Sequence, residues 1–292
     1  MMIRIGIIGY GVVGENTGLL FADIPDPKQI KILKYDKYKT GRWNTIKEIS
    51  SCDFIFICLP TPMGDHGRID LTYIDGALEE INSFCRGNRP IVIIRSTSVS
   101  GSSDIYAQKY KAFEIAFVPE FLTEKNPWND TKNATRLVIG ANSISVFFAI
   151  KSLFQIYYQD RIHYIHLTRE EAEMYKYACN YLLSMSVLSA NELYFICQSV
   201  GIDYQKIQEN LKHDKRIGSF TQVPGHDGDF GIGGKCFPKD ISALYALAKE
   251  NDYNAEFLKT AIDFNLKIRK RHDWLDIAGA ISGNKYNPEN IE

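Results

Sequence analysis

Cys236 is the residue whose surroundings point most directly to chemistry. It lies in the segment GIGGKCFPKD, after a glycine-rich loop and directly before a predicted helix whose early residues include Lys239 and Asp240. A thiol beside a helix N-terminus and lysines should have a lowered pKa, because both features favour the thiolate. We therefore predict a nucleophile, the alternative being a buried cysteine that acts as a small apolar side chain. For the other five cysteines, which form no CxxC pair, we favour that alternative.

Lys176 and Asn180 form a second candidate pair. They are four residues apart in a segment otherwise rich in Tyr, Leu, Met and Ala, so they share one face of a predicted helix. A lysine that faces a cleft could stabilise a developing oxyanion. The alternative is a solvated polar stripe on an amphipathic helix, and helix statistics alone favour it.

A glycine motif near the N-terminus predicts a nucleotide site. Gly9, Gly11 and Gly14 form the pattern GxGxxG between a predicted strand and a predicted helix, where the backbone can approach a pyrophosphate and the helix N-terminus faces its charge. Asp36 ends the next strand, where a carboxylate accepts hydrogen bonds from the adenosine ribose of NAD and repels the additional phosphate of NADP. The alternative is a glycine-rich turn followed by a surface aspartate.

The elements that must position these residues alternate between strands and helices in the first half of the chain. Short apolar runs at 3–8, 30–35, 53–59, 91–94, 115–118, 136–139 and 163–166 are predicted strands, with helices between most of them. This alternation predicts a doubly wound parallel sheet. Pro60, Thr97 and Glu120 each follow a strand, at the sheet edge where ligands lie in such folds, although turn chemistry could also explain each of them.

The second half of the chain is predicted to be helical. Thr168 and Glu171 form a capping-box signature that opens a helix running to about Val200. A short helix at 204–211, a glycine- and proline-rich loop at 218–238 and a final long helix from about Asp240 to Ile268 follow. We therefore predict an α/β protein with an N-terminal Rossmann-type domain (residues 1–166) and an all-α central domain (167–292).

Composition excludes several classes of function. Charged residues make up 24% of the chain and the formal net charge is −1, so a nucleic-acid partner is not expected. No apolar run reaches the roughly 20 residues of a membrane helix, and no signal-peptide layout is present. The scattered cysteines indicate neither a disulfide framework nor a metal site. We expect a cytoplasmic protein without a membrane or nucleic-acid partner.

Taken together, the motifs resemble those of the UDP-glucose/GDP-mannose dehydrogenase family. The matching segments are GYGVVG, CLPTP with GRIDLTYI, RSTSVSG, FVPEFLTE, AEMYKYACN with SANE, RIG and GIGGKCFPKD, in order from residue 3 to about 270. The family oxidises the C6 alcohol of a sugar nucleotide to a carboxylate and passes two hydrides in turn to two NAD molecules. The resemblance implies that Cys236 attacks the intermediate aldehyde to give a thiohemiacetal and then a thioester, which water cleaves.

The same resemblance implies roles for further residues. Lys176 and Asp240 would flank the reacting oxygen with Asn180 supporting the oxyanion, while Thr97 and Glu120 handle a water and the proton. Glu124 would lie near the sugar, and Arg216 would reach the substrate of a neighbouring subunit in a homodimer built on the central helices. The residues implied for NAD binding are Gly9, Gly11, Val12, Val13, Gly14, Asp36, Pro60, Thr61, Thr97, Glu124 and Lys239. The residues implied for substrate binding are Glu120, Phe121, Leu122, Lys176, Asn180, Arg216, Gly233 and Cys236.

The sequence also departs from the family pattern. The 292 residues contain no counterpart of the family's second Rossmann-like domain, RSTSVSG lacks a Val-Pro pair, and the loop before Cys236 is longer by a few residues. Loss of remote substrate contacts should reduce both affinity and rate. Two alternatives therefore stay open. One is a two-electron dehydrogenase of the 6-phosphogluconate or hydroxyacid type, which needs no thiol, and the other is a non-catalytic protein that binds NAD.

Overall fold

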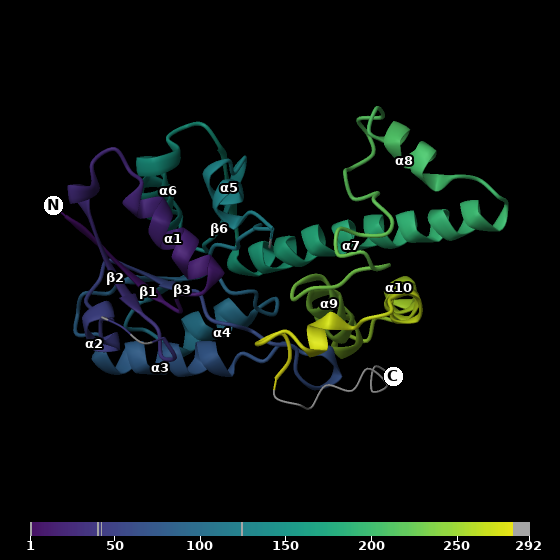
Figure 1. Ribbon diagram of the computed structural model, residues 1–292. Helices are drawn as coiled ribbons and strands as arrows, with labels where there is room; N and C mark the ends of the chain where they lie inside the picture. Colours follow the sequence, from purple (N-terminus) through teal and green to yellow (C-terminus); the bar gives the residue numbers. More distant parts are fainter. Residues whose placement is uncertain (1, 40, 42, 124, 283–292) are drawn as a thin grey trace. The chain divides into compact units, whose positions relative to one another are not determined.

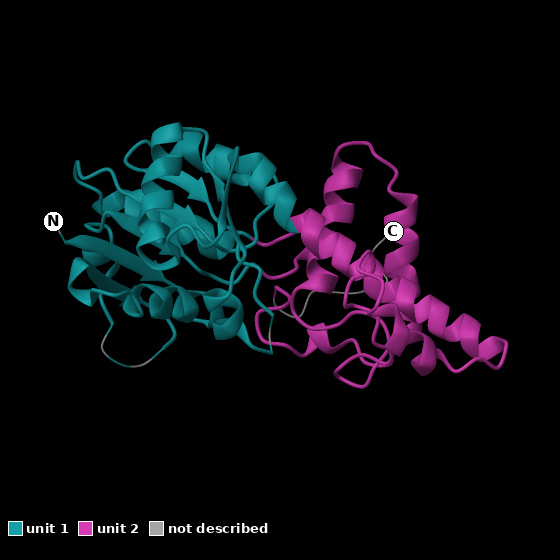
Figure 2. Ribbon diagram, turned by 90° about the horizontal axis from the view of Figure 1, so that it is seen from above, with its two compact units in different colours: residues 1–61, 71–176 teal, residues 62–70, 177–292 magenta. Residues whose placement is uncertain are grey.

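The computed structural model describes residues 2–39, 41, 43–123 and 125–282. Contacts between residues divide the chain into two compact units, shown in Figure 2. The first unit comprises residues 1–61 and 71–176, and the second comprises residues 62–70 and 177–292. The division therefore falls within the long helix that follows the last strand, and the segment 62–70 belongs with the C-terminal part of the chain.

The first unit is built on a seven-stranded sheet in the order β2-β1-β3-β4-β5-β6-β7. Its strands are β1 (Ile3–Ile8), β2 (Ile30–Tyr35), β3 (Phe54–Ile57), β4 (Ile91–Ile94), β5 (Glu114–Phe117), β6 (Arg136–Gly140) and β7 (His163–Leu167). Neighbouring strands pair in parallel, except that β5 and β6 pair antiparallel with Phe117 opposite Gly140. The predicted doubly wound sheet is confirmed, with its last two strands reversed.

Helices cover both faces of this sheet, which is why its central strands are apolar along their whole length. One apolar core joins the sheet to α1 (Val12–Ala22) and α6 (Ile144–Tyr158), and the other joins it to α2 (Ile46–Ile49), α3 (Thr72–Phe84) and α4 (Ser102–Lys109). Figure 1 shows the same two layers of helices on opposite sides of the strands. Ile55, Ile57, Val92 and Ile94 have no exposed surface, so the carboxyl ends of β3 and β4 are held rigidly.

Two helices of the first unit were not expected from the sequence. Between β2 and β3, Thr45 and Glu48 form a capping box that starts the one-turn helix α2. Pro127 at the first helical turn begins the short helix α5 (Pro127–Lys132). Both helices are too short for hydrophobic periodicity to reveal them.

The chain after β7 is helical, as predicted. The long helix α7 (Arg169–Ser199) opens with the expected capping box, in which Glu171 Oε2 accepts from Thr168 N at 2.8 Å and Thr168 Oγ1 accepts from Glu171 N at 3.2 Å. It is followed by α8 (Tyr204–Leu211), α9 (Phe237–Glu250) and α10 (Glu256–Ile268). The described part of the chain also includes short 3-10 turns at Pro27–Gln29, Asp65–Gly67 and Asp273–Leu275.

The prediction of one continuous helix from Asp240 to Ile268 is wrong. Helix α9 ends at Glu250, and residues 251–255 separate it from α10. Asp252 adopts a left-handed conformation with φ of 56°, and Tyr253 N donates back to Ala248 O at 2.9 Å, which closes the helix end. Asn and Asp tolerate this conformation because their side chains bond the local backbone. No helix in the described residues is both long and apolar enough to cross a membrane.

Candidate functional site

The turn between β1 and α1 requires glycine at two of the three motif positions. Gly9 has a φ of +85°, and a Cβ there would lie 2.5 Å from the carbonyl oxygen of Cys58. A Cβ at Gly14 would lie 2.0 Å from the carbonyl oxygen of Gly9. These two glycines therefore let the turn fold back on itself and let α1 pack closely on the strands.

Gly11 differs from the other two because nothing in the protein crowds it. No heavy atom lies within 4 Å of a Cβ built at this position, and its φ of −77° is open to any residue. Gly11 is the N-cap residue of α1, and no side chain caps that helix end. Uncapped N–H groups beside open space suit an anionic group such as a pyrophosphate. Val12 is exposed and Val13 is half-buried on the first turn.

Asp36 lies next to this turn, as predicted, but backbone groups already occupy much of its carboxylate. Oδ2 accepts from Tyr10 N at 2.8 Å, and Oδ1 accepts from Tyr38 N at 3.0 Å and Lys39 N at 3.2 Å. Burial alone would raise the pKa of Asp36, but these bonds and the charge of Lys39 hold it below its usual value. The group stays ionised and keeps a lone pair on Oδ2 for a ribose hydroxyl.

The predicted residues at the sheet edge follow β3 and β4. Pro60 is exposed and Thr61 is buried after β3. Thr97 is half-buried after β4, directly between Ser96, whose Oγ donates to Leu59 O at 2.7 Å, and Ser98. The hydrogen bond of Ser96 joins the two loops, so that Thr97 and Thr61 lie at the same edge of the sheet.

Lys176 does not lie in a solvated stripe. Its Nζ donates to the carbonyl oxygen of Glu120 at 2.6 Å and lies 3.2 Å from Glu120 Oε1, and the two side chains are only 6% and 12% exposed. The same ammonium lies 5.2 Å from the centre of the Phe121 ring. Glu120 Oε2 also accepts from Leu122 N at 2.7 Å. The structure thus brings Lys176 together with three predicted residues of the β5 loop.

Predicted residues from α1 and from the β5 loop line one cavity of about 230 Å³ in the first unit. These residues are Val13, Glu120, Phe121 and Leu122. Arg95 and Arg136, which the sequence analysis did not select, line it as well. Since a whole-ligand pocket usually measures roughly 300–1,000 Å³, this cavity suits one part of a larger ligand.

Glu173 is a buried residue of the first unit that the sequence analysis missed. Its side chain accepts from the hydroxyls of Ser98, Ser102 and Ser103 at 2.6–3.0 Å and from the backbone N–H groups of Gly101 and Ser103 at 2.6 and 3.0 Å. Burial raises the pKa of Glu173 in spite of these bonds. It lies three residues before Lys176, hence on the same side of α7. That spacing, an acidic residue beside the lysine on an apolar helix, was the signal available in the sequence.

In the second unit, Asn180 contacts Asp240. Asn180 Nδ2 donates to Asp240 Oδ2, and Lys239 Nζ lies 2.6 Å from Asp240 Oδ1. All three residues are buried, with exposed fractions of 6%, 2% and 6% for Asn180, Asp240 and Lys239. A buried carboxylate held by an ammonium and an amide is fixed in orientation. Lys239, predicted to bind the cofactor, is therefore engaged by the neighbouring aspartate.

Cys236 is the N-cap residue of α9, and its carbonyl oxygen accepts from Asp240 N at 2.9 Å. The thiol is half-buried, as is the side chain of Cys179, whereas the other four cysteines are buried. This placement confirms that Cys236 stands at a helix N-terminus. Cys58 is instead fully enclosed, and burial raises the pKa of its thiol to about 12.

The remaining predicted residues have different surroundings. Gly233, in the loop before Cys236, lies against the guanidinium of Arg269, because a Cβ there would be 1.9 Å from Arg269 Nη2. Arg216 has an 88% exposed side chain and pairs with Asp214 two residues away. Glu124 lies outside the described residues.

Comparison with known proteins gives a consistent result for both units. Residues 37–158 match the model of the UDP-glucose/GDP-mannose dehydrogenase family, NAD binding domain, and residues 170–267 match that of the same family, central domain. The UDP-glucose 6-dehydrogenase TuaD of Bacillus subtilis (strain 168) is 30% identical over 317 aligned positions, covering 97% of the chain and 67% of the relative.

Two further relatives agree. The UDP-glucose 6-dehydrogenase of Rhizobium meliloti (strain 1021) is 30% identical, covering 96% of the chain and 71% of the relative. A solved UDP-glucose dehydrogenase from Pyrobaculum islandicum superposes with a TM-score of 0.77 at 23% identity, over 91% of the chain and 68% of that structure. The chain thus spans about two thirds of the length of the relatives it matches.

Proposed function

The chain belongs to the UDP-glucose/GDP-mannose dehydrogenase family, and we therefore propose that it oxidises the C6 hydroxyl of a sugar nucleotide to a carboxylate with NAD as the hydride acceptor. The observation that carries the proposal is the environment of Cys236, at the N-terminus of a helix whose first turn holds the buried Lys239–Asp240 pair. A two-electron dehydrogenase does not need a thiol at this position.

The proposed reaction proceeds through Cys236. Loss of a hydride and a proton converts the alcohol into an aldehyde, and the sulfur of Cys236 adds to the carbonyl carbon to form a thiohemiacetal. Loss of a second hydride and a second proton gives a thioester. Water then attacks the thioester carbonyl, the carbon–sulfur bond breaks, and the carboxylate leaves with the thiol restored. Bound NAD supplies the acceptor for each hydride.

Residues of the first unit would stabilise the reacting oxygen of the substrate and accept the proton that it loses. Lys176 carries a buried positive charge that stabilises an alkoxide or oxyanion, because charge is screened weakly in a site removed from water. Glu120 lies beside it and accepts a proton directly or through water, with Thr97 on the neighbouring loop positioning that water. We assign Glu124, by its position in the family motif, to the sugar and the hydrolytic step.

In the second unit, Asn180 and Asp240 would hold the reacting oxygen of the substrate. The Asn180 amide keeps one N–H for an oxyanion while the other is donated to Asp240. Lys239 fixes the charge and the orientation of Asp240.

The residues of the β1–α1 turn fit NAD. Open space at Gly11 and the uncapped N-terminus of α1 suit the pyrophosphate, and the free lone pair of Asp36 suits the adenosine ribose. Val12, Val13, Pro60 and Thr61 would contact the cofactor along the sheet edge. Because Asp36 is ionised, we propose that the chain prefers NAD to NADP.

We further propose a homodimer built on α7. Three apolar side chains recur on one side of this helix at helical spacing and are 38–63% exposed, which is unusual for a helix of a monomer. They are Leu182, Leu193 and Ile196. In such a dimer the exposed side chain of Arg216 is free to reach the substrate of the partner subunit, where its guanidinium would bind a phosphate.

A stoichiometric assay tests the proposed function. The purified chain is incubated with NAD and each of a panel of UDP- and GDP-sugars, and NADH is counted by absorbance against the acid product by mass spectrometry. Two NADH per acid molecule are expected for at least one sugar nucleotide. One NADH per product would support the two-electron dehydrogenase, and no turnover of any sugar nucleotide would support the non-catalytic alternative.

A further inference from the structure

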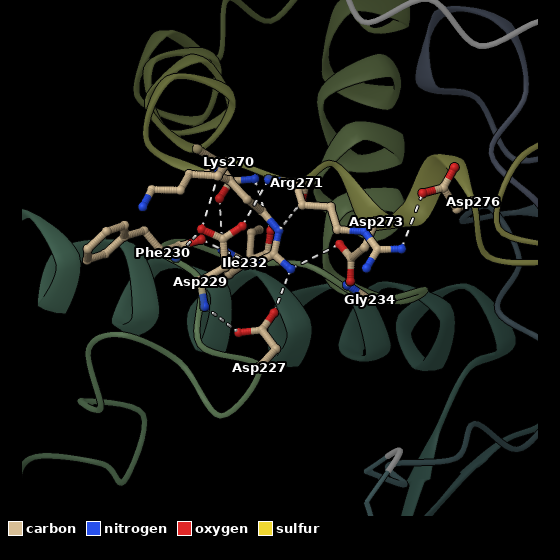
Figure 3. Close-up of polar contacts among 11 residues, drawn as sticks. Asp227, Asp229, Phe230, Ile232, Gly234, Lys270, Arg271, Asp273 and Asp276 are labelled. Carbon is tan, nitrogen blue, oxygen red and sulfur yellow. Dashed lines mark hydrogen bonds and ion pairs between the residues drawn. The ribbon is translucent and has the colours of Figure 1, made fainter.

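The loop that leads to Cys236 is held by buried polar side chains of the second unit. Asn191 accepts from Gly231 N, Asn265 bonds the backbone of Ile232, and Arg269 binds the flanking residues. Arg269 is 5% exposed and directly follows α10. Its Nη2 lies 2.6 Å from Asp227 Oδ2 and 3.0 Å from Asp273 Oδ1, and its Nη1 donates to the carbonyl oxygen of Phe230 at 3.1 Å. Figure 3 shows Asp227, Phe230 and Asp273 close together, with dashed lines for the polar contacts in this cluster. The guanidinium of Arg269 thus joins Asp227 and Phe230 of the loop to Asp273 in the segment after α10.

A second aspartate of the loop bonds the same segment through the backbone. Asp229 accepts from Lys270 N at 3.2 Å and from Arg271 N at 2.9 Å, as well as from Phe230 N at 2.8 Å. Burial alone would raise the pKa of both Asp227 and Asp229, but their hydrogen bonds and the charge of Arg269 keep both below the usual value. Both carboxylates are therefore ionised and bound at neutral pH.

The anchored part of the loop includes the last residues before the thiol. A Cβ at Gly233 would collide with Arg269 Nη2 at 1.9 Å and with Asp273 Oδ1 at 2.6 Å, so the guanidinium packs directly on the backbone at that position. Gly234 N donates to Asp273 Oδ2 at 3.1 Å. Only Lys235 separates these fixed residues from Cys236, which is itself the N-cap of α9.

We propose that Arg269 is a positioning residue that holds the loop at Asp227, Phe230 and Gly233 and thereby fixes Cys236 at the N-terminus of α9. The consequence for catalysis rests on the proposed function, since it requires Cys236 to be the nucleophile. Arg269 does not touch the reacting atoms in this scheme. It acts through the loop, with Asp227 and Asp273 as its two anionic partners.

The geometry distinguishes positioning from a simple effect of charge. Arg269→Lys keeps the positive charge but has three donors on one nitrogen, so it cannot replace the four bonds that Nε, Nη1 and Nη2 of the guanidinium make in different directions. Asp227→Asn removes a negative charge, which by electrostatics alone would favour the thiolate of Cys236. If Arg269 acts by positioning, Arg269→Lys and Asp227→Asn both loosen the loop and both reduce thiolate formation at Cys236. If it acts only by its charge, Arg269→Lys leaves thiolate formation unchanged and Asp227→Asn increases it.

The test is the pH dependence of alkylation by iodoacetamide, followed at each cysteine by peptide mass spectrometry on the full chain. Wild type is compared with Arg269→Lys, Asp227→Asn and the matched control Arg271→Met. Arg271 is two residues from Arg269, but its side chain is 74% exposed and its ion pair is with Asp276 at 3.5 Å, outside the loop. Labelling of the buried Cys52, Cys85 and Cys197 reports any unfolding of a variant.

We expect the pH midpoint of Cys236 alkylation to rise in Arg269→Lys and in Asp227→Asn and to stay unchanged in Arg271→Met. A rise of one pH unit corresponds to a roughly tenfold lower alkylation rate at pH 7. In turnover, kcat should fall by about 10–100-fold while the KM for NAD stays within a factor of about two. An unchanged midpoint in Arg269→Lys, or a lowered midpoint in Asp227→Asn, overturns the proposal. If Arg269→Lys exposes the buried cysteines, the proposal is judged by the direction in which Asp227→Asn shifts the pH midpoint of Cys236 alkylation.

These outcomes are independent of the proposed function. Alkylation is measured without substrate, so the midpoints decide whether Arg269 positions Cys236 even if the chain forms no acid. Conversely, if a Cys236→Ser variant still forms acid at the wild-type rate, the proposed function fails while the alkylation result stands.

Discussion

Substitution of two neighbouring glycines by alanine separates the role of the β1–α1 turn in folding from its role in NAD binding. At Gly14 an added Cβ would lie 2.0 Å from the carbonyl oxygen of Gly9, about 1 Å closer than any real contact, and that partner is backbone. At Gly11 the same methyl group finds no heavy atom within 4 Å. The two variants add the same group three residues apart, so each is the control for the other.

The magnitudes follow from these distances. Relief of the Gly14 clash must move α1 or the turn, which should cost about 1–3 kcal/mol of unfolding free energy. Gly11→Ala should change the unfolding free energy by less than about 1 kcal/mol, because its backbone conformation is an ordinary one and the restriction of the unfolded chain by alanine is offset by the poor N-cap preference of alanine. Its methyl group fills the space proposed for the pyrophosphate, so the affinity for NAD should fall at least about tenfold.

Urea denaturation measures the unfolding free energy of each variant, and titration calorimetry measures its affinity for NAD. We expect Gly11→Ala to fold like wild type and to bind NAD poorly, and Gly14→Ala to be destabilised. If Gly11→Ala binds NAD with wild-type affinity, the pyrophosphate does not lie at this turn and the interpretation of the GxGxxG motif is refuted.

Two further predictions concern other parts of the chain. Because burial raises the pKa of Glu173, the fold favours its protonated form, whose stabilising contribution is fully present below the ordinary glutamate pKa of 4.5 and is lost as pH rises through the folded-state value. The unfolding free energy of wild type minus that of Glu173→Gln should therefore decrease from pH 4 to pH 7 in urea titrations, and a constant difference would contradict the assignment. On α7, the double variant Leu193→Asp and Ile196→Asp should convert a dimer into a folded monomer in light-scattering measurements, whereas a dimer that persists would place the interface elsewhere.

The sheet and the long helix could be predicted from the sequence because their signals are local. Each strand is a short apolar run between turn residues, and Thr168 with Glu171 marks the start of α7 by two hydrogen bonds within one turn. The break between α9 and α10 was missed because it depends on the left-handed conformation of Asp252, which hydrophobic periodicity does not report. The family was also correctly identified, from motifs that follow one another in order.

The candidate site was predicted less completely. Motif positions selected Lys176, Asn180 and Asp240, and the structure shows each in a buried polar contact. The sequence did not indicate that Lys176 is paired with Glu120, because the two are 56 residues apart. Glu173 and Arg269 escaped notice for a similar reason, since most of the groups that hold them lie on a distant segment or on the backbone; the exception is Asp273, four residues from Arg269. Such long-range polar contacts leave no periodic pattern in the chain.

The role of Cys236 as the nucleophile is tested most directly by the product that Cys236→Ser forms. This product is compared with those of wild type and of Cys179→Ser, which changes the other half-buried cysteine. With a sugar nucleotide that wild type oxidises, quenched samples are analysed by mass spectrometry for acid, for aldehyde and for a covalent adduct on the peptide that contains residue 236. We predict a substrate-derived thioester on Cys236 in wild type and in Cys179→Ser, and a loss of acid of at least about 100-fold in Cys236→Ser with NAD binding unchanged. Acid produced by Cys236→Ser at the wild-type rate would show that Cys236 is not the nucleophile.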